Sequence, residues 1–273
     1  LPQAGSLAAR AAELAVARHP NGWCVSRQPN RGESWPFILD LLERLAPGRL
    51  SAAGLNCTLA VDSNGRVHSF GVDTHGQLGQ GYKHGQRVLD PRPIAQLEHE
   101  QTACVALRHK HSAATTKSGA LYTWGTGTAG ALGYDVANAR ILPVPKRVVL
   151  PTVPGSRVVL VAVGDSHTAC LTDEGAVFTW GYAQQGALGH EGVGVIVHEP
   201  TRVQALSQAG RCIDVSCGGQ TTAAVSATGA LFMWGTCVNP HTTSLDDEQR
   251  DRTIRTPEQI TGFFVDAAFT RTS

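Results

Sequence analysis

The sequence lacks the features that would point to a membrane, a nucleic acid or a metal. No apolar run approaches the roughly 20 residues needed to span a bilayer, so no transmembrane segment is predicted. Basic and acidic residues nearly balance, 23 against 22, and no long run of Lys and Arg occurs, so no direct contact with nucleic acid is expected. No two of the 7 cysteines have CxxC spacing, and His109 and His111 have no third ligand within reach by sequence. Neither a metal site nor another cofactor is therefore predicted.

Catalytic motifs are missing as well. No Ser/His/Asp order, HExxH sequence or paired-carboxylate motif stands out. Asp173 and Glu174 are adjacent acids, but they fall in a predicted turn, where acidic residues are usually solvated. Pairs of glycines such as Gly76 and Gly79 form neither a P-loop nor a dinucleotide fingerprint. The sequence therefore predicts a protein that is not an enzyme.

The cysteines bear on the cellular compartment. Their odd number, 7, argues against a complete set of intrachain disulfides. Several of them, such as Cys57 and Cys170, sit in apolar strand-like runs, where a free cysteine behaves as a small buried hydrophobe. These features predict a reducing intracellular compartment. Segment 6–18, rich in Ala with two Arg and one acid, is compatible with a transit-peptide remnant or with a short amphipathic helix, so cytoplasm and mitochondrion both stay open.

Glycine, by contrast, is abundant, with 30 residues, and its placement is periodic. Four times an anchor residue is followed eleven positions later by a glycine, and an aromatic-Gly pair ends six positions after that. Repeats of this size build arrays, solenoids or propellers. The four sets are Gly54, Gly65, Phe70 and Gly71; Arg108, Gly119, Trp124 and Gly125; Gly164, Gly175, Trp180 and Gly181; and Gly218, Gly229, Trp234 and Gly235.

Each unit contains four strand signals. In the third unit they are an apolar run at 158–163, a second run at 167–171, a third at 176–180 after the turn glycine Gly175, and a fourth near Pro200. Glycine at the turn takes the positive φ that a tight hairpin needs. Four short strands in each unit, with glycine turns between them, predict an all-β fold made of propeller blades.

The segment after the aromatic-Gly pair makes the assignment more specific. Residues 75–79, 129–133 and 185–189 each end in Gly-x-Leu-Gly at one offset, and the units together read G-x-x-H-T-x-A-L-x-x-x-G-x-V-x-x-W-G-x-x-x-x-G-x-L-G. This pattern resembles the regulator-of-chromosome-condensation repeat family, whose members form β-propellers, typically of seven blades. The resemblance covers residues 50–273 and divides them into units of about 50–103, 104–156, 157–210 and 211–262 and a stub at 263–273.

Departures from the family pattern are informative. Cys57 and Phe70 stand where the family favours His and Trp, Arg108 takes an anchor-glycine position, and Thr221 replaces a His. The fourth unit lacks the Gly-x-Leu-Gly tail and has the polar tract 236–255, which is expected to be a solvated loop. Four units and the opening of a fifth cannot close a seven-bladed ring, so an incomplete propeller is predicted. It follows an N-terminal extension, 1–49, with two short helices.

Most repeated side chains are expected to serve the fold. His167, which recurs as His111, is expected to hydrogen-bond the backbone of a neighbouring blade. Trp124, Trp180 and Trp234 are expected to fill the spaces between blades. By elimination, function falls to the variable loop residues after the aromatic-Gly pair, which should line one face. These candidate partner-binding residues are Asp73, Thr74, His75, Thr126, Thr128, Ala183, Gln184 and Gln185.

The functional prediction is a non-catalytic scaffold or adaptor that binds protein partners within a larger complex. An open propeller would leave blade edges unpaired unless a partner covers them. The alternative, implied by the family resemblance, is guanine-nucleotide exchange on a small GTPase. Direct chromatin binding, also known in the family, relies on a basic tail that is not seen in this sequence.

Overall fold

The computed structural model describes residues 49–54, 56–81, 85–135, 140–151, 155–192, 194–238 and 251–260. The chain divides into two compact units, Leu1–Leu50 and Ser51–Ser273, and nearly all of the described residues belong to the second. The two predicted N-terminal helices and the expected stub at 263–273 lie outside the described residues.

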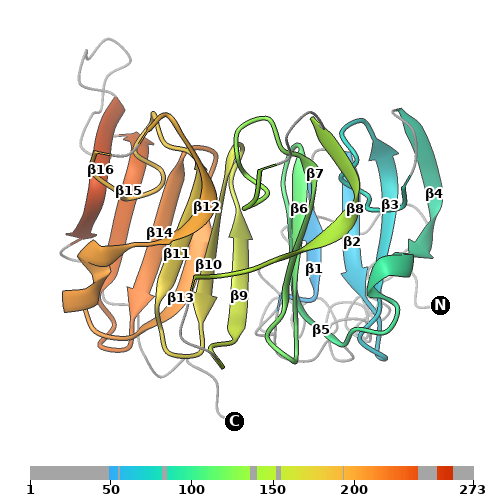
Figure 1. Cartoon of the computed structure of the whole chain (residues 1–273), viewed down its shortest axis with the longest axis horizontal. Helices are drawn as coiled ribbons and strands as arrows, with labels where there is room; N and C mark the ends of the chain where they lie inside the picture. The colour runs from blue at the N-terminus through green and yellow to red at the C-terminus, as the bar shows by residue number, and fades with distance from the viewer. Residues whose placement is uncertain are drawn as a thin grey trace, which may run out of the picture. The chain divides into compact units, whose positions relative to one another are not determined.

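Four antiparallel sheets, each of four consecutive strands, make up the described part of the second unit (Figure 1). We call them blades 1 to 4 in chain order. Blade 1 contains β1 (Ser51–Ala53), β2 (Cys57–Val61), β3 (Val67–Asp73) and β4 (Gln86–Pro93); blade 2 contains β5 (Thr102–Leu107), β6 (His111–Thr116), β7 (Leu121–Thr126) and β8 (Ile141–Val148). Blade 3 contains β9 (Val158–Val163), β10 (His167–Thr172), β11 (Val177–Tyr182) and β12 (Ile196–Arg202); blade 4 contains β13 (Cys212–Cys217), β14 (Thr221–Ser226), β15 (Leu231–Val238) and β16 (Asp251–Ile260). Two short 3-10 helices, η2 (Ala95–Leu97) and η3 (Gln204–Gln208), follow β4 and β12. The prediction of an all-β fold of four-stranded sheets is confirmed.

The hairpin between the second and third strands of each blade shows why these sequences turn where they do. In blade 3, Gly175 adopts φ +83°, a conformation that side chains other than glycine rarely take. Three residues earlier, Thr172 accepts a hydrogen bond on its hydroxyl from the Ala176 amide at 3.1 Å. Thr116 and Ser226 close the equivalent hairpins in the same way. A turn glycine and a capping hydroxyl are therefore the local signals for this hairpin.

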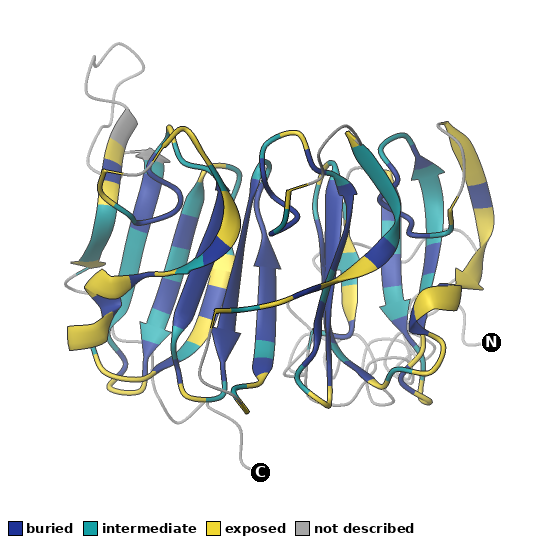
Figure 2. Ribbon diagram, in the orientation of Figure 1, coloured by how far each residue is buried: buried dark blue, intermediate teal, exposed yellow. Residues whose placement is uncertain are grey.

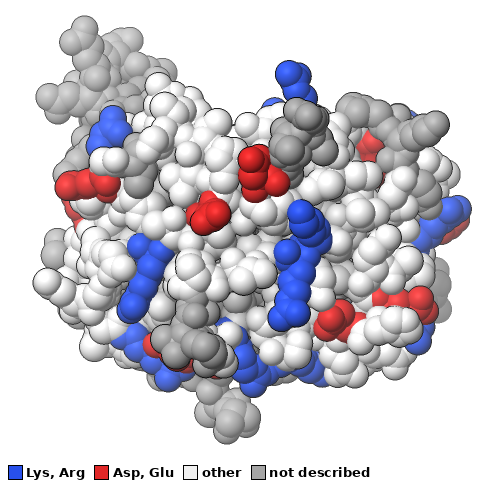
Figure 3. Space-filling view, in the orientation of Figure 1, with Lys and Arg blue, Asp and Glu red and all other residues white. Residues whose placement is uncertain are grey.

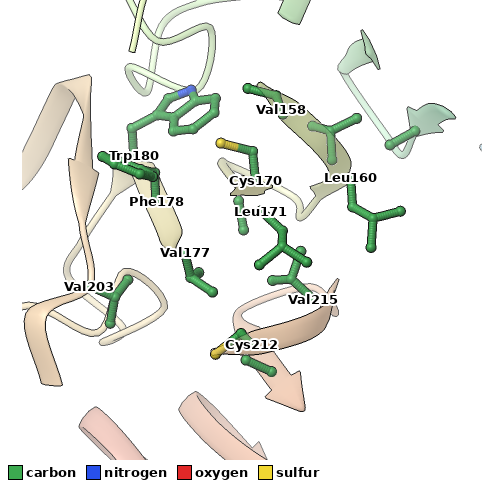
Figure 4. Packing of buried hydrophobic residues seen from close by; sticks show 14 of the residues in the cluster. Val158, Leu160, Cys170, Leu171, Val177, Phe178, Trp180, Val203, Cys212 and Val215 are labelled. Atoms are coloured by element: carbon green, nitrogen blue, oxygen red, sulfur yellow. The ribbon is translucent and has the colours of Figure 1, made fainter. Parts of the chain in front are cut away.

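The blades follow one another through their first strands: β1 lies beside β5, β5 beside β9, and β9 beside β13. Buried residues concentrate on β5, β9 and the second and third strands, whereas the outer strands β4 and β12 are largely exposed (Figure 2). Apolar side chains of blades 2, 3 and 4 form one core cluster. In Figure 4, Cys170 lies between Trp180 and the β9 residues Val158 and Leu160, with Val215 of blade 4 close by.

Each blade has proline in the edge strand of its sheet. β4, β8, β12 and β16 form the outer edges of their sheets, and each contains at least one proline. Because proline has no N–H to donate, it is tolerated on an edge strand and discourages pairing with another chain.

The Gly-x-Leu-Gly segments bind each blade to the next. Trp180 of blade 3 donates its Nε1–H to the Ala131 carbonyl of blade 2 at 2.9 Å, and a Cβ at Gly133 would lie 2.9 Å from that nitrogen. On the other side of the segment, a Cβ at Gly130 would lie 2.7 Å from Ile196 Cγ2 of β12. Only glycine therefore lets this segment fit between the tryptophan and the outer strand of the following blade. In the same way, the backbone carbonyl of Gln77 accepts from Trp124 Nε1–H at 2.8 Å, and that of Ala187 accepts from Trp234 Nε1–H at 2.9 Å.

Blade 4 departs from the other three, and one prediction about it is wrong. The tract 236–255 was expected to be a loop, but β15 continues to Val238 and β16 begins at Asp251, with Thr236 paired to Thr253 and Val238 to Asp251. The residue before the aromatic explains part of the difference. In the other blades it is Ser69, Thr123 or Thr179, whose hydroxyl donates to the leucine carbonyl of Gly-x-Leu-Gly. Blade 4 has Met233 there, and no such segment follows for a hydroxyl to hold.

Candidate interaction face

One end of the blades carries two sets of loops, which together we call the loop face. The first set joins the first and second strands and includes residues 108–110, 164–166 and 218–220. The second set follows the third strand and includes residues 74–76, 127–130 and 183–186. Because successive strands are antiparallel, the start of the second strand and the end of the third lie at the same end of the sheet. The hairpins lie at the opposite end.

Polar contacts join the loop face from blade to blade. Arg108 of blade 2 forms an ion pair with Asp165 of blade 3, with Nε and Oδ1 2.6 Å apart. Both side chains stay about half in solvent, at 42% and 48% exposure, so they remain accessible to a partner. The Asp165 amide in turn donates to the Gly219 carbonyl of blade 4 at 3.0 Å. Between blades 1 and 2, the rings of His75 and His109 lie 6.1 Å apart at 43°.

The predicted residues Thr74 and His75 lie on this face in a well-bonded loop. Thr74 Oγ1 and His75 Nδ1 are 2.8 Å apart, and the His75 amide donates to Gln77 Oε1 at 2.6 Å. The Gln77 amide group donates to the Val72 carbonyl at 3.1 Å. These bonds hold the half-buried His75 ring in a defined position.

Asp73, proposed from sequence as a partner-binding residue, is instead an interior residue. It is the last residue of β3, and its side chain is only 1% exposed. The inward side of the strand is buried, and Asp73 falls on that side, so its carboxylate cannot reach a partner. It lies near Cys57, whose pKa is raised chiefly by burial and further by the Asp73 charge.

The other predicted residues differ in how far they are exposed to solvent. Thr128 and Gln184 are exposed, and the Tyr182 hydroxyl donates to the Gln184 side chain. Ala183 and Gln185 are half-buried. Thr126 ends β7, and its Oγ1 is buried without a hydrogen-bond partner among the described residues.

Beneath the loop face, a repeated network links the blades. Thr168 of blade 3 donates its hydroxyl to the Ala131 carbonyl at 2.8 Å, and His111 Nε2 lies 2.9 Å from the same hydroxyl oxygen. Because the only hydroxyl hydrogen goes to the carbonyl, the oxygen accepts from His111 Nε2–H. His167 and Thr222 repeat the arrangement one blade later at 2.9 Å. Each histidine therefore contacts a threonine hydroxyl of the next blade, and that hydroxyl donates to a carbonyl of the histidine's own blade. Burial lowers the pKa of the two rings, and hydrogen bonding to the backbone of the next blade, at His167 and Thr221, opposes it with a smaller effect.

Burial keeps these histidines uncharged. Burial lowers the pKa of His111 to about 3 and that of His167 to about 4. Burial also raises the thiol pKa values of Cys57, Cys170 and Cys212, so these groups stay protonated at neutral pH and are poor nucleophiles. In the described ranges, no group of three or more His, Cys, Asp or Glu side chains is placed to hold a metal ion. No helix in that part of the chain is long and apolar enough to cross a membrane.

Sequence reasoning missed the residues that connect the loop face. Arg108 stood out only as a departure from the anchor glycine, and His109 and Asp165 were not among the partner-binding candidates. The available signal for a functional residue was Arg108 itself, which stands where the other three units have glycine. The repeat needs no side chain at that position, so a charged one there suggests a role other than folding. The partner of Arg108, Asp165, is 57 residues away, and nothing local connects the two.

Comparison with known proteins agrees with this architecture. The sequence-family model of the regulator of chromosome condensation (RCC1) repeat matches residues 64–115, 118–171 and 174–225. A second family model of the same repeat matches residues 158–187. The chain belongs to the RCC1 repeat family.

Curated relatives include proteins with different whole-chain roles. The human E3 ubiquitin-protein ligase HERC2 is 34% identical over 74% of this chain and 4% of its own length. The bovine secretion-regulating guanine nucleotide exchange factor is 32% identical over 76% of this chain and 43% of its own. The mitochondrial RCC1 domain-containing protein RUG3 of Arabidopsis thaliana is 32% identical over 69% of this chain and 44% of its own. This chain thus spans less than half the length of these relatives.

Among solved structures, that of human WBSCR16 is similar with a TM-score of 0.66 and 25% identity. The match covers 77% of this chain and 52% of that one. It supports a propeller arrangement of the four sheets.

Proposed function

We propose that the chain is a non-catalytic protein-interaction module that binds a partner through its loop face. The observation that carries the proposal is a contrast between two levels of this face. Beneath it, the same hydrogen bonds recur from blade to blade. At its surface, equivalent positions differ: the residue after the anchor is His109, Asp165 and Gly219 in successive blades. A repeated framework with non-repeated loops is typical of a scaffold whose surface is adapted to a particular partner.

Site-specific photocrosslinking tests the proposal. A benzophenone amino acid replaces Thr128 or Gln184 on the loop face, or, as the matched control, Thr228, which is exposed in the blade 4 hairpin. In cells that express the protein, we expect a discrete protein adduct from positions 128 and 184 and none of that mass from 228. Charge reversal by Arg108→Glu should reduce the adduct. The same adduct from all three positions, or none from the loop face, would contradict the proposal.

A second candidate is guanine-nucleotide exchange on a small GTPase. It is favoured by the similarity to a relative named as an exchange factor and by the half-exposed Arg108–Asp165 pair, which offers both charges to a partner. The test is the release of a fluorescent nucleotide from a panel of purified small GTPases. Acceleration by the wild-type chain, reduced in Asp165→Ala, supports exchange; release at the background rate throughout the panel refutes it for that panel.

Three further proposals concern the size of the propeller, the assembly in which the protein works and its cellular compartment. We propose that the four blades belong to a larger propeller, because the chain corresponds to about half of the WBSCR16 structure, at 52%. We also propose that the protein works in a multi-subunit assembly, in the cytoplasm or, like the relative named as mitochondrial, in mitochondria. Native mass measurement of the endogenous protein and cell fractionation test these two points.

A further inference from the structure

We propose that a hollow at the hairpin end of blade 3 binds an acidic peptide segment of a protein partner. It lies at the opposite end of β10 and β11 from the loop face, so this site is separate from the one proposed above. The hollow has a volume of about 240 Å³ and is bounded by the β10–β11 hairpin, the end of β12, η3 and the residues just before β13. We call it the blade 3 hollow.

Three nearly buried apolar side chains lie at the base of the blade 3 hollow, while most of its accessible surface is polar and its rim is charged. Val177, Val203 and Leu206 line it and are 2%, 2% and 4% exposed. Arg202 and Arg211 stand exposed at its rim. In the space-filling view, Lys and Arg side chains gather along the lower edge, the end of the blades that carries the hairpins (Figure 3).

Arg211 is held in place without losing its charge. Its side chain lies over Gly175, where a Cβ would collide with it, and its Nη2 donates to the Asp173 carbonyl at 2.8 Å. A carbonyl carries no net charge, so this bond orients the guanidinium and leaves its charge uncompensated. The ion pairs found among the described residues are Arg108–Asp165 and His68–Asp62, and neither involves Arg202 or Arg211. Two guanidiniums that form no ion pair among the described residues line one hollow with a single carboxylate, Glu174, and this excess of positive charge favours a carboxylate ligand, which arginine binds with paired hydrogen bonds.

Blade 1 shows that the repeat does not require these arginines. By strand register, Pro93 occupies the position of Arg202, since Pro93 pairs with His68 as Arg202 pairs with Phe178. Gln101 lies over the turn glycine Gly65 as Arg211 lies over Gly175. Blade 1 has the acidic Glu98, the residue just after η2, at the position that Ser207 of η3 takes in blade 3. The same fold is therefore built in blade 1 with no arginine at this corner, whereas blade 2 repeats the pair, with Arg147 at the Arg202 position and Arg157 over the turn glycine Gly119.

The dimensions of the hollow favour a peptide side chain as the occupant. Pockets for whole small molecules measure about 300–1,000 Å³, which is more than the blade 3 hollow provides. The hollow has room for one short peptide side chain, and the carboxylates that follow it in the peptide reach Arg202 and Arg211 at the rim. Glu174, the one acidic residue among those that line the hollow, accepts a hydrogen bond from Ser156 Oγ at 3.4 Å, so the lining carries two positive charges and one negative charge.

Titration of the full chain with acetyl-Ala-Leu-Glu-Glu-Ala-amide, followed by amide chemical shifts in NMR, tests the proposal. We expect shifts at Gly175, Ser207 and Arg211 and at least about tenfold weaker binding to Arg202→Glu, the loss expected for one charge-assisted pair. The matched control is Arg147→Glu, the same strand position in blade 2, because Arg147 pairs with Tyr122 as Arg202 pairs with Phe178; its binding should change less than twofold, about the scatter of such a titration. Acetyl-Ala-Leu-Gln-Gln-Ala-amide should bind at least about tenfold more weakly than the acidic peptide.

Four outcomes would overturn the proposal: no shift at these amides at about 1 mM peptide, equal binding of the two peptides, equal losses in Arg202→Glu and Arg147→Glu, or tighter binding of a single-stranded oligonucleotide. Arg108→Glu, at the other end of the blades, should leave peptide binding unchanged. The peptide titration therefore tests the blade 3 hollow whether or not the loop face binds a partner. The crosslinking experiment likewise tests the loop face whether or not the hollow binds the peptide.

Discussion

The junction between blades 2 and 3 and the junction between blades 1 and 2 use the same type of acceptor in different surroundings. At the 2–3 junction, the Ala131 carbonyl accepts from Trp180 at 2.9 Å and from Thr168 at 2.8 Å, and His111 supports the threonine. At the 1–2 junction, the Gln77 carbonyl accepts from Trp124 at 2.8 Å and from Ser112 at 2.7 Å. There Cys57 takes the place of the histidine.

The difference separates what every junction needs from what only some have. A tryptophan and a hydroxyl on one carbonyl are common to all three described junctions, so they are the shared mechanical link. The buried histidine is an addition at the 2–3 and 3–4 junctions, and it makes these two sensitive to protonation.

Truncation of the shared element should have the largest effect. Trp180→Ala removes a side chain that is 0% exposed, together with its bond to Ala131, and should lower the free energy of unfolding by about 3–5 kcal/mol. Urea denaturation followed by circular dichroism measures it. Trp124→Ala should cost a similar amount, because the tryptophan contact is the same at both junctions; a loss below about 1 kcal/mol in either variant would show that the tryptophans are not the shared link.

Acid should weaken the two histidine-containing junctions. The folded pKa values, about 3 for His111 and about 4 for His167, lie below the ordinary value of 6.5. The unfolded chain therefore binds more protons below pH 6.5, and stability that is present above this pH is lost as the pH falls. Each histidine should contribute a slope of about 1.4 kcal/mol per pH unit below about pH 6.

Urea titrations at several pH values between about 7.5 and 5 measure this slope, where most carboxylates stay ionised. The double variant His111→Gln, His167→Gln is the control, because it keeps every other titrating group. Its stability should fall less steeply with acid than that of the wild type. Parallel curves would remove the histidines as the cause.

Removal of the hydroxyl should distinguish the junctions by a smaller amount. Thr168→Val removes the hydroxyl that accepts from His111 Nε2–H and leaves the Ala131 carbonyl with one donor, and should cost about 1–3 kcal/mol. Ser112→Ala only reduces the donors to Gln77 from two to one, and should cost about 1 kcal/mol or less. Chemical denaturation of both variants in one buffer gives the comparison. Equal losses would mean that the histidine does not depend on the threonine.

The smallest effect is expected at the surface of the 2–3 junction. Arg108→Ala removes an ion pair that is about half in solvent, and should cost at most about 0.2–1 kcal/mol, less at high salt. Thermal unfolding at low and high salt measures it. A loss as large as that of Thr168→Val would place the pair among the structural elements of the junction and weaken the case for its role in binding.

Much of the fold was predictable because its signals are local. Turn glycines such as Gly175, with its positive φ, and the runs between them mark the strands of each blade without reference to the rest of the chain. The link between blades was not predictable, since Trp180 and its acceptor Ala131 are 49 residues apart. The tract 236–255 was misread for a related reason: its polar composition indicates a loop, but pairing between β15 and β16 stabilises its ends as strand.

For the candidate site, the sequence located the loops but not their exposure. Thr128 and Gln184 are at the surface as expected, whereas Asp73 is 1% exposed. Arg108 and Asp165 became candidates only when the structure brought them together.

By itself, the sequence determined the number of sheets in the described region, the positions of their hairpins and the family, because backbone conformation and alternating hydrophobicity depend on neighbours along the chain. Only the tertiary structure decided which carbonyl each tryptophan meets, which loop residues are buried, and that two arginines frame a hollow at the far end of blade 3. These features depend on the packing of one blade against the next, between residues about 50 positions apart, and no local pattern encodes that packing.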